Sequence, residues 1–409
     1  MSAAGSREHD LVLVGATGFV GRLTARHLAR YAPAGTRIAL AGRSPERLEA
    51  LRSDLGGTAA RWPLVTLDVA EEAGLAALAR STRVVLTTVG PYLRYGVPLV
   101  SACAEAGTDY ADLTAEALFV RRAVDTGHAS ARRSGSRIVH ACGFDSVPSD
   151  LGVGLCAARA AAEGEGQLTA SVLHVRSMRG GFSGGTVDSL RQQLLEVRLQ
   201  PSARAVLGRA DALLDSPPGP GGRRSGHLAL PGRDRPGGRW HAPYLLGVFN
   251  TQIVHRTDAL LGGAYATTFR HREVIDTGRG VAGAAGAAAV AGGTAALVAG
   301  LWFAPTRAVL DRVLPAPGAG PSERLLERGR FCVEVLATTT TGARYRTRVA
   351  ADIDPGYAGT AAMLGEAGLS LAFDELPGRS GVLTPWVAFG QRLAARLRTQ
   401  GFTVQTDRL

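Results

Sequence analysis

The 409-residue chain contains no lysine, so all 46 of its basic residues are arginines. This absence excludes a Tyr-x-x-x-Lys catalytic pair, and with it any mechanism in which a lysine ammonium serves as the acid. A proton needed in catalysis must therefore come from Tyr, His, Asp, Glu, Cys or water.

Cysteine is also scarce, and its four positions lack the spacing of metal ligands. The N-terminus has no signal-peptide pattern. These absences predict no metal site and place the protein in a reducing cytoplasm. The four cysteines are Cys103, Cys142, Cys156 and Cys332.

The charge balance is strongly positive, with a formal net charge of +11. Such a charge attracts phosphorylated cofactors, acidic carrier proteins or an anionic membrane face. The arginines are scattered and no nucleic-acid-binding motif is present, so we expect no nucleic-acid partner. The length predicts two domains with ample core.

Residues 10–21 form an apolar strand that runs directly into a glycine-rich turn, and a helical pattern follows. This is how a dinucleotide-binding βαβ unit begins. Gly15 permits the tight turn, Gly18 lets the backbone approach a pyrophosphate, and Gly21 lets the helix pack closely on the strand. The helix N-terminus adds free N–H groups and partial positive charge. The predicted phosphate contacts come from Gly15, Ala16, Thr17, Gly18, Phe19, Val20 and Gly21.

The end of the second expected strand, residues 37–41, distinguishes NADP(H) from NAD(H). An NAD site usually places Asp or Glu there to bind the ribose 2′-hydroxyl. Here Arg43 can pair with a 2′-phosphate and Ser44 can donate to it, which predicts NADP(H). The alternative for Arg43 is a solvated arginine. Asp68 ends the third strand at the expected adenine edge, and its alternative role is a helix N-cap.

Two later strand ends supply the candidate catalytic residues. Gly90 and Pro91 would form a rigid backbone beside the cofactor. Tyr92 could stack on the nicotinamide ring or donate a proton, or else pack as a boundary aromatic. Asp145 could orient a donor or bind the carboxamide, or else cap a turn before Pro148.

Other polar residues near these ends carry weaker expectations. Cys142 has no identifiable activating histidine, and His140 is expected to be a strand residue with a satisfied imidazole. The polar strand residues 109–112 are either structural hydrogen-bonders or pocket residues, and the sequence does not separate these roles.

The pattern along the chain predicts an α/β protein. Residues 1–150 alternate between strands and helices, as in a Rossmann-type doubly wound parallel sheet. Residues 151–383 read as a second, α+β domain for substrate binding or dimerisation, which contains a mobile loop at 216–239. Residues 384–409 are expected to form a C-terminal helix that packs back on the first domain.

Residues 281–306 contain no charge and are long enough to span a bilayer. Their Ala and Gly content disfavours stable insertion, while Trp302 and Phe303 resemble an interfacial anchor. Three alternatives stay open: a transmembrane helix, a surface helix touching lipid, and a buried or dimer-forming helix.

The chain resembles the saccharopine-dehydrogenase-like oxidoreductases, in particular the branch that includes mycobacterial trans-acting enoyl reductases of complex lipid synthesis. The resemblance covers nearly the whole chain and implies a cofactor in the N-terminal domain. It departs at Tyr244, where the family more often has Phe. The residues that carry it are 15–21, 41–43, 89–92, 96–100, 103–114, 140–150, 240–244, 352–360, 363–366 and 381–385.

From these observations we expect an NADPH-dependent reductase of an activated C=C bond in a lipidic or carrier-bound acyl substrate. The C=C part follows from the resemblance alone. One alternative is an imine or carbonyl reductase of a small substrate. Another is a catalytically silent NADP-binding scaffold at a membrane. We expect a cytoplasmic protein, associated with the inner face of the plasma membrane through residues 281–306, and a homodimer is compatible with the sequence.

Overall fold

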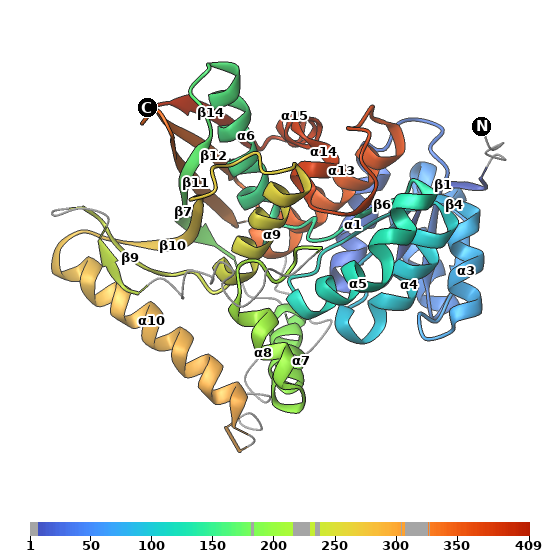
Figure 1. Ribbon diagram of the computed structural model, residues 1–409. Helices are drawn as coiled ribbons and strands as arrows, with labels where there is room; N and C mark the ends of the chain where they lie inside the picture. The colour runs from blue at the N-terminus through green and yellow to red at the C-terminus, as the bar shows by residue number, and fades with distance from the viewer. Residues whose placement is uncertain are drawn as a thin grey trace. The chain divides into compact units, whose positions relative to one another are not determined.

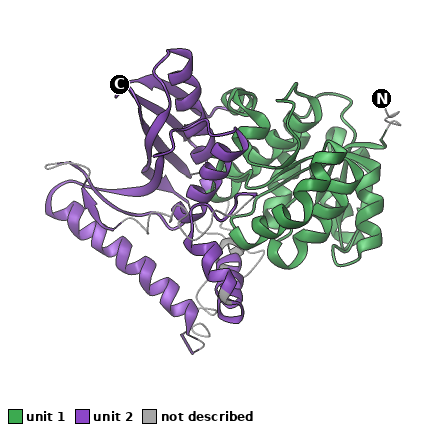
Figure 2. Ribbon diagram, in the orientation of Figure 1, with its two compact units in different colours: residues 1–147, 318–320, 356–400 green, residues 148–317, 321–355, 401–409 purple. Residues whose placement is uncertain are grey.

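The computed structural model describes residues 7–180, 184–215, 230–233, 238–303, 305–306, 326 and 328–409. These residues form two compact units, which Figure 2 shows in different colours. The first unit contains residues 7–147 and 356–400. The second contains the described residues between 148 and 355 together with residues 401–409.

The first unit is built on a seven-stranded, all-parallel sheet with the order β13-β6-β5-β4-β1-β2-β3. Its central strands are uninterrupted buried runs, as expected for a parallel sheet covered on both faces. The order matches a doubly wound dinucleotide-binding sheet extended by one strand. The strands are β1 (His9–Val14), β2 (Ile38–Gly42), β3 (Leu64–Thr66), β4 (Thr82–Thr87), β5 (Asp109–Asp112), β6 (Arg137–Val139) and β13 (Gly381–Leu383).

Helices cover both faces of this sheet (Figure 1). One face carries α1 (Phe19–Tyr31) and α2 (Pro45–Leu55). The other carries α3 (Glu72–Ser81), α4 (Tyr92–Ala106) and α5 (Ala117–Ser134). The remaining part of the first face is covered by α13 (Thr360–Phe373), which contacts α1 and the strands β1, β4 and β5.

This arrangement differs from the expected domain limits. Residues 356–383 belong to the first unit rather than to the 151–383 domain, because the apolar helix α13 is needed to cover β4 and β5. The expected C-terminal helix is divided at Gly390 (φ +53°) into α14 (Pro385–Phe389) and α15 (Gln391–Thr399). The chain then ends in a strand, β14 (Thr403–Arg408), which belongs to the second unit.

The second unit contains a mixed seven-stranded sheet with the order β14-β12-β11-β7-β10-β9-β8. A β-hairpin is formed by β11 (Arg330–Thr339) and β12 (Arg344–Ala351), which pair antiparallel around Gly342. Its other strands are β7 (Leu168–Arg179), β8 (Gly232–Arg233), β9 (Trp240–Pro243) and β10 (Arg270–Gly278). Its helices are α6 (Val147–Ala162), α7 (Gly184–Leu199), α8 (Pro201–Gly208), α9 (Gly247–Leu260) and α10 (Gly280–Trp302).

The helix α10 accounts for most of the uncharged segment 281–306. Its first turns pack on β9 and β10, where a Cβ on Gly283 would lie 3.1 Å from the Trp240 ring. Only three of its residues are buried. Of the expected loop 216–239, residues 216–229 and 234–237 lie outside the described residues.

Candidate functional site

The glycine turn between β1 and α1 has the geometry of a phosphate-binding turn. Gly15 has a φ of +81°, a conformation that favours glycine. A Cβ on Gly21 would overlap the carbonyl oxygen of Gly15, so this glycine permits the close approach of α1 to the turn.

Gly18 differs from the other two glycines because an added Cβ there would be less crowded. It is exposed at the N-cap of α1, and an added Cβ would meet only the Gly15 carbonyl oxygen, at 3.3 Å. No side chain among the described residues caps this N-terminus, so the first backbone N–H groups of α1 are available to a ligand. This turn fits the pyrophosphate of a dinucleotide.

Arg43 and Ser44 follow β2 but have different surroundings. Arg43 is exposed, and its guanidinium has no hydrogen bond or ion pair within the described part of the chain. The Ser44 hydroxyl accepts the Arg47 N–H at 3.2 Å and donates to Glu46 at 2.8 Å, so it caps α2. Arg43 is thus available for a 2′-phosphate, whereas Ser44 would have to release Glu46 to donate.

Asp68 holds its own turn after β3. Its Oδ1 accepts the Ala70 N–H at 3.0 Å, while the N-cap of α3 is Glu71. The side chain therefore stabilises the connection before α3 instead of capping the helix. It remains half-buried at the C-terminal end of the sheet.

The segment after β4 is held in place by a buried carboxylate. Gly90 and Pro91 are joined by a cis peptide bond, and Gly90 is exposed. The buried carboxylate of Glu116 accepts the backbone N–H groups of Tyr92 (2.9 Å) and Leu93 (2.8 Å). A negative charge at this position stabilises the N-terminus of α4. Sequence reasoning did not identify Glu116.

Tyr92 is a buried, fully engaged residue. Its hydroxyl donates to the Thr87 carbonyl oxygen (3.2 Å) and accepts the Leu113 N–H (3.3 Å). Its ring stacks on Phe119 at 5.6 Å. Burial raises the pKa of the Tyr92 hydroxyl well above its ordinary value. This geometry favours the packing role over proton donation.

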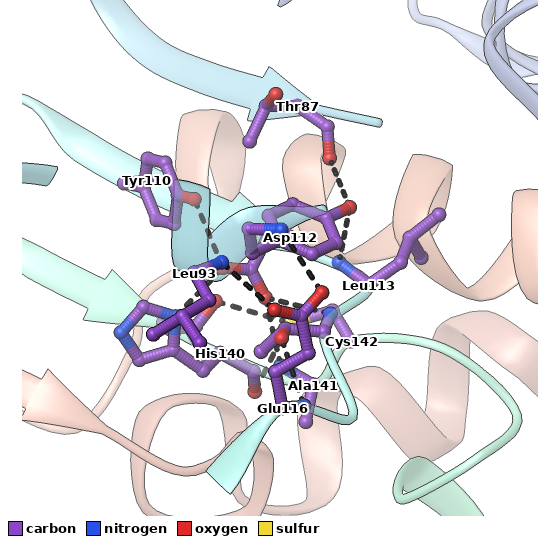
Figure 3. Close-up of polar contacts among 12 residues, drawn as sticks. Thr87, Leu93, Tyr110, Asp112, Leu113, Glu116, His140, Ala141 and Cys142 are labelled. Carbon is purple, nitrogen blue, oxygen red and sulfur yellow. Dashed lines mark hydrogen bonds and ion pairs between the residues drawn. The ribbon is translucent and has the colours of Figure 1, made fainter. Parts of the chain in front are cut away.

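A buried polar cluster joins the ends of β5 and β6 (Figure 3). Asp112 Oδ2 accepts the Tyr110 hydroxyl at 2.9 Å and lies 2.7 Å from His140 Nδ1. Asp112 Oδ1 accepts the backbone N–H groups of Thr114 (3.0 Å) and Ala141 (3.1 Å). The carboxylate is thus fully coordinated, and it fixes the geometry of both strand ends.

His140 only partly matches the expected satisfied imidazole. Its Nδ1 is paired with Asp112, but its Nε2 is buried without a hydrogen-bond partner among the described residues. The polar residues at 109–112 are structural hydrogen-bonders in this fold. The 28 residues that separate Asp112 from His140 hid the pair from sequence reasoning; the parallel pairing of β5 and β6 brings them together.

The loop after β6 combines an unusual backbone with a perturbed carboxyl. Ala141 has a φ of +62°, the one positive φ outside glycine within the described residues. Such strain is found preferentially at functional sites. The Cys142 N–H donates to the Asp112 carbonyl oxygen at 2.7 Å. Asp145 follows in the same loop, and burial raises its pKa to about 6.

These features meet at one edge of the sheet. The glycine turn, Gly90–Pro91 and the loop with Asp145 follow the C-terminal ends of β1, β4 and β6. In an open parallel sheet this edge is where ligands bind. No group of three or more His, Cys, Asp or Glu side chains in the described part of the chain is arranged to hold a metal ion.

Comparison with known proteins identifies the cofactor. Residues 11–139 match the model of the saccharopine dehydrogenase NADP-binding domain. This match covers the glycine turn and Arg43, whose geometry fits the same group. NADP(H) is therefore the cofactor of the first unit, and when bound it supplies a transferable hydride.

Full-length relatives carry a consistent name. A trans-acting enoyl reductase of Mycobacterium ulcerans is 45% identical over 426 residues, covering 100% of both chains. A trans-acting enoyl reductase of Mycobacterium tuberculosis is 44% identical over 414 residues, covering 98% of this chain and 99% of the relative.

A solved structure gives the same fold at low identity. The apo saccharopine dehydrogenase (L-Glu forming) of Saccharomyces cerevisiae superposes with a TM-score of 0.54 and 13% identity, covering 98% of this chain and 100% of that chain. Taken with the NADP-binding domain and the full-length relatives, this places the chain in the saccharopine-dehydrogenase-like family of NADP-dependent oxidoreductases, within the group of the trans-acting enoyl reductases.

Proposed function

We propose that this protein reduces an activated C=C bond in a lipidic acyl substrate held on an acidic carrier, with NADPH as the reductant. The observation that supports this most strongly is the full-length identity of 44–45% with trans-acting enoyl reductases. The reaction adds a hydride to the β-carbon and a proton to the α-carbon of the enoyl group. The net charge of +11 favours an acidic carrier.

We assign the cofactor-binding roles from the geometry of the first unit. The turn 15–21 takes the pyrophosphate and Arg43 takes the 2′-phosphate. Asp68 borders the adenine, and the backbone of Gly90–Pro91 lies beside the nicotinamide. Tyr92 packs behind the Gly90–Pro91 backbone, and Ser44 caps α2 directly after Arg43.

Asp145 is the proposed proton donor. A carboxyl with a pKa of about 6 keeps a fraction of its proton at neutral pH, which suits a general acid. The turnover rate should therefore fall as the pH rises through about 6, and Asp145→Asn should lower the rate and flatten this profile. An unchanged profile in the variant would contradict the assignment.

The same pKa shift predicts how the stability depends on pH. Folding raises the pKa of Asp145, so ionisation of this group destabilises the folded state as the pH rises from about 4 through about 6. The free energy of unfolding of Asp145→Asn should therefore rise relative to that of wild type as the pH is raised from about 4 to about 8, by at most roughly 3 kcal/mol. Urea unfolding at both pH values measures it.

The reaction type can be tested directly by following NADPH oxidation. We expect turnover with a long-chain trans-2-enoyl thioester, and none with a 2-oxo acid plus an amine. Turnover with the second pair alone would favour the imine reductase. Tight NADPH binding without turnover of either substrate would favour the silent scaffold.

We further propose that α10 attaches the protein to the inner face of the plasma membrane. The helix is uncharged over 23 residues, only three of these residues are buried, and Val281 is 87% exposed. Both of its ends are held by the second unit, since its first turns pack on β9 and β10 and the Trp302 carbonyl accepts Arg198 of α7 at 3.1 Å. Because both ends of the helix are attached to the same unit, we expect it to lie along the bilayer surface rather than to cross the bilayer.

Vesicle binding tests this attachment. The protein should bind vesicles of anionic phospholipid at low salt and be released by high salt or carbonate. Ala295→Glu, at an exposed position of α10, should weaken binding, whereas Ala161→Glu, at an exposed position near the end of α6, should not. Release only by detergent would indicate a spanning helix. Self-association without vesicle binding would indicate a dimer helix.

A further inference from the structure

The segment between β12 and α13 touches two separate parts of the candidate site. The chain passes from the second unit to the first after Pro355, and residues Pro355–Gly359 form one π-helical turn before α13. The Tyr357 ring contacts the Phe19 ring edge-on, with centroids 5.0 Å apart. The Thr360 hydroxyl accepts the Phe144 N–H at 3.1 Å. Both Tyr357 and Thr360 are buried.

These two contacts reach the ends of the cofactor site. Phe19 is the first residue of α1, directly after the phosphate turn. Phe144 immediately precedes Asp145 in the strained loop after β6. The same threonine also packs against the loop backbone, because a Cβ on Gly143 would lie 3.0 Å from Thr360 Cγ2. One short segment therefore contacts both the phosphate turn and the loop with Asp145.

The helix behind this segment is fixed to α1. Glu366 of α13 pairs with His27 of α1 at 2.8 Å, and Arg396 of α15 adds a second contact to the same carboxylate at 3.2 Å. A Cβ on Gly365 would lie 2.5 Å from the His27 ring. The phosphate turn leads directly into α1. Because Thr360 belongs to α13, the packing of α13 on α1 sets the position of Thr360 relative to that turn.

We propose that Thr360 is a positioning residue that holds the loop 142–146 at a fixed position relative to the phosphate turn. Tyr357 packs against the start of α1 and supports this arrangement. The inference rests on the proposed role of Asp145 in proton transfer. Thr360 makes no contact with a reacting group in this account. It acts through the Phe144 backbone, so its loss should affect the chemical step and leave cofactor affinity nearly unchanged. Small displacements of a catalytic group cost up to about 100-fold in rate.

The test compares Thr360→Val, which removes the hydroxyl at nearly constant volume, with Thr360→Ser, which keeps it. Hydrogen exchange of the Phe144 amide reports the bond directly. Thr360→Val should accelerate this exchange by about tenfold and lower the turnover of a trans-2-enoyl thioester by about 10- to 100-fold. The NADPH dissociation constant should change by less than about threefold. Thr360→Ser should restore the exchange rate and the turnover.

Other outcomes overturn the proposal. Unchanged Phe144 exchange in Thr360→Val would show that the hydroxyl does not hold the loop. Faster exchange with normal turnover would show that the loop position does not matter for the chemistry. Equal loss of stability and rate in both variants would show a merely structural role.

A separate reading applies if wild type does not turn over the thioester, because the proposed function then fails on its own. The positioning is then decided by the pKa of Asp145, followed by carbon-13 NMR. Thr360→Val should move this pKa from about 6 toward its ordinary value, and Thr360→Ser should not. An identical pKa in all three proteins would overturn the positioning role.

Discussion

The helices α13 and α10 are similar in sequence and opposite in environment. Both are rich in Ala and Gly; α13 carries one ionisable residue, Glu366, and α10 carries none. Every residue from Thr360 to Ala372 is buried, whereas α10 buries only three of its 23 residues. The first covers the parallel sheet of its own unit, and the second lacks a covering layer among the described residues.

This difference indicates which part of the protein surface is suited to bind another molecule. Folding tends to bury apolar surface, because each Å² of apolar surface removed from water stabilises the folded state by about 25 cal/mol. A long exposed apolar helix therefore marks an interaction surface. The glycine turn shows the same contrast on a smaller scale, since an added Cβ on Gly21 would overlap the Gly15 carbonyl oxygen, whereas one on Gly18 would lie 3.3 Å from it. The smaller crowding at Gly18 suits the proposed pyrophosphate, and the exposed surface of α10 suits the proposed membrane attachment.

The largest expected effect is on the buried charge of α13. Glu366→Gln leaves His27 and Arg396 without their shared carboxylate and should cost about 3–5 kcal/mol of unfolding free energy. The exposed pair Arg26–Asp54 supplies the control, because Asp54→Asn should cost less than about 1 kcal/mol. Urea unfolding measures both. Equal losses would mean that α13 does not depend on this ion pair.

The next prediction compares two glycines of the phosphate turn. Gly21→Ala should destabilise the fold by about 1–3 kcal/mol, because its methyl group overlaps the Gly15 carbonyl. Gly18→Val should leave folding intact and abolish NADPH binding, because its side chain occupies the pyrophosphate position. Thermal unfolding and cofactor fluorescence separate the two. A Gly18→Val protein that binds NADPH normally would place the phosphates elsewhere.

A matched pair of helix glycines, one in α13 and one in α10, should show effects of opposite sign. In Gly368→Ala the new methyl carbon would lie 2.6 Å from Leu86 Cδ1, so α13 should lose about 1–3 kcal/mol. Gly292 in α10 has nothing within 4 Å, so Gly292→Ala should stabilise by roughly 0.5–1 kcal/mol through helix propensity. Destabilisation by Gly292→Ala would show that α10 is covered after all.

The sequence predicted the features that depend on local pattern. The strand, turn and helix over residues 9–31 are contiguous, so their apolar run and glycine spacing were sufficient. The β11–β12 hairpin is equally local, because its two strands are joined by a short turn at Gly342. The start of α4 at Tyr92 is less local, because the Glu116 carboxylate, which lies 24 positions away in the sequence, accepts the Tyr92 N–H there.

Features that depend on distant pairing were not predictable. An apolar helix such as α13 does not state which sheet it covers, so the domain limit was placed after it. The Asp112–His140 pair and the Phe144–Thr360 hydrogen bond join residues 28 and 216 positions apart. Such contacts arise from sheet order and from the return of the chain after residue 355, which no local pattern encodes.

The central claim is that the first unit binds NADPH with the 2′-phosphate on Arg43, and paired fluorescence titrations test it most directly. Wild type should bind NADPH at least about tenfold more tightly than NADH, because a charged hydrogen-bonded pair contributes about 1.5–3 kcal/mol. Arg43→Ala should lose this preference while keeping its affinity for NADH. Equal affinities in wild type, or an undiminished preference in Arg43→Ala, would contradict the account.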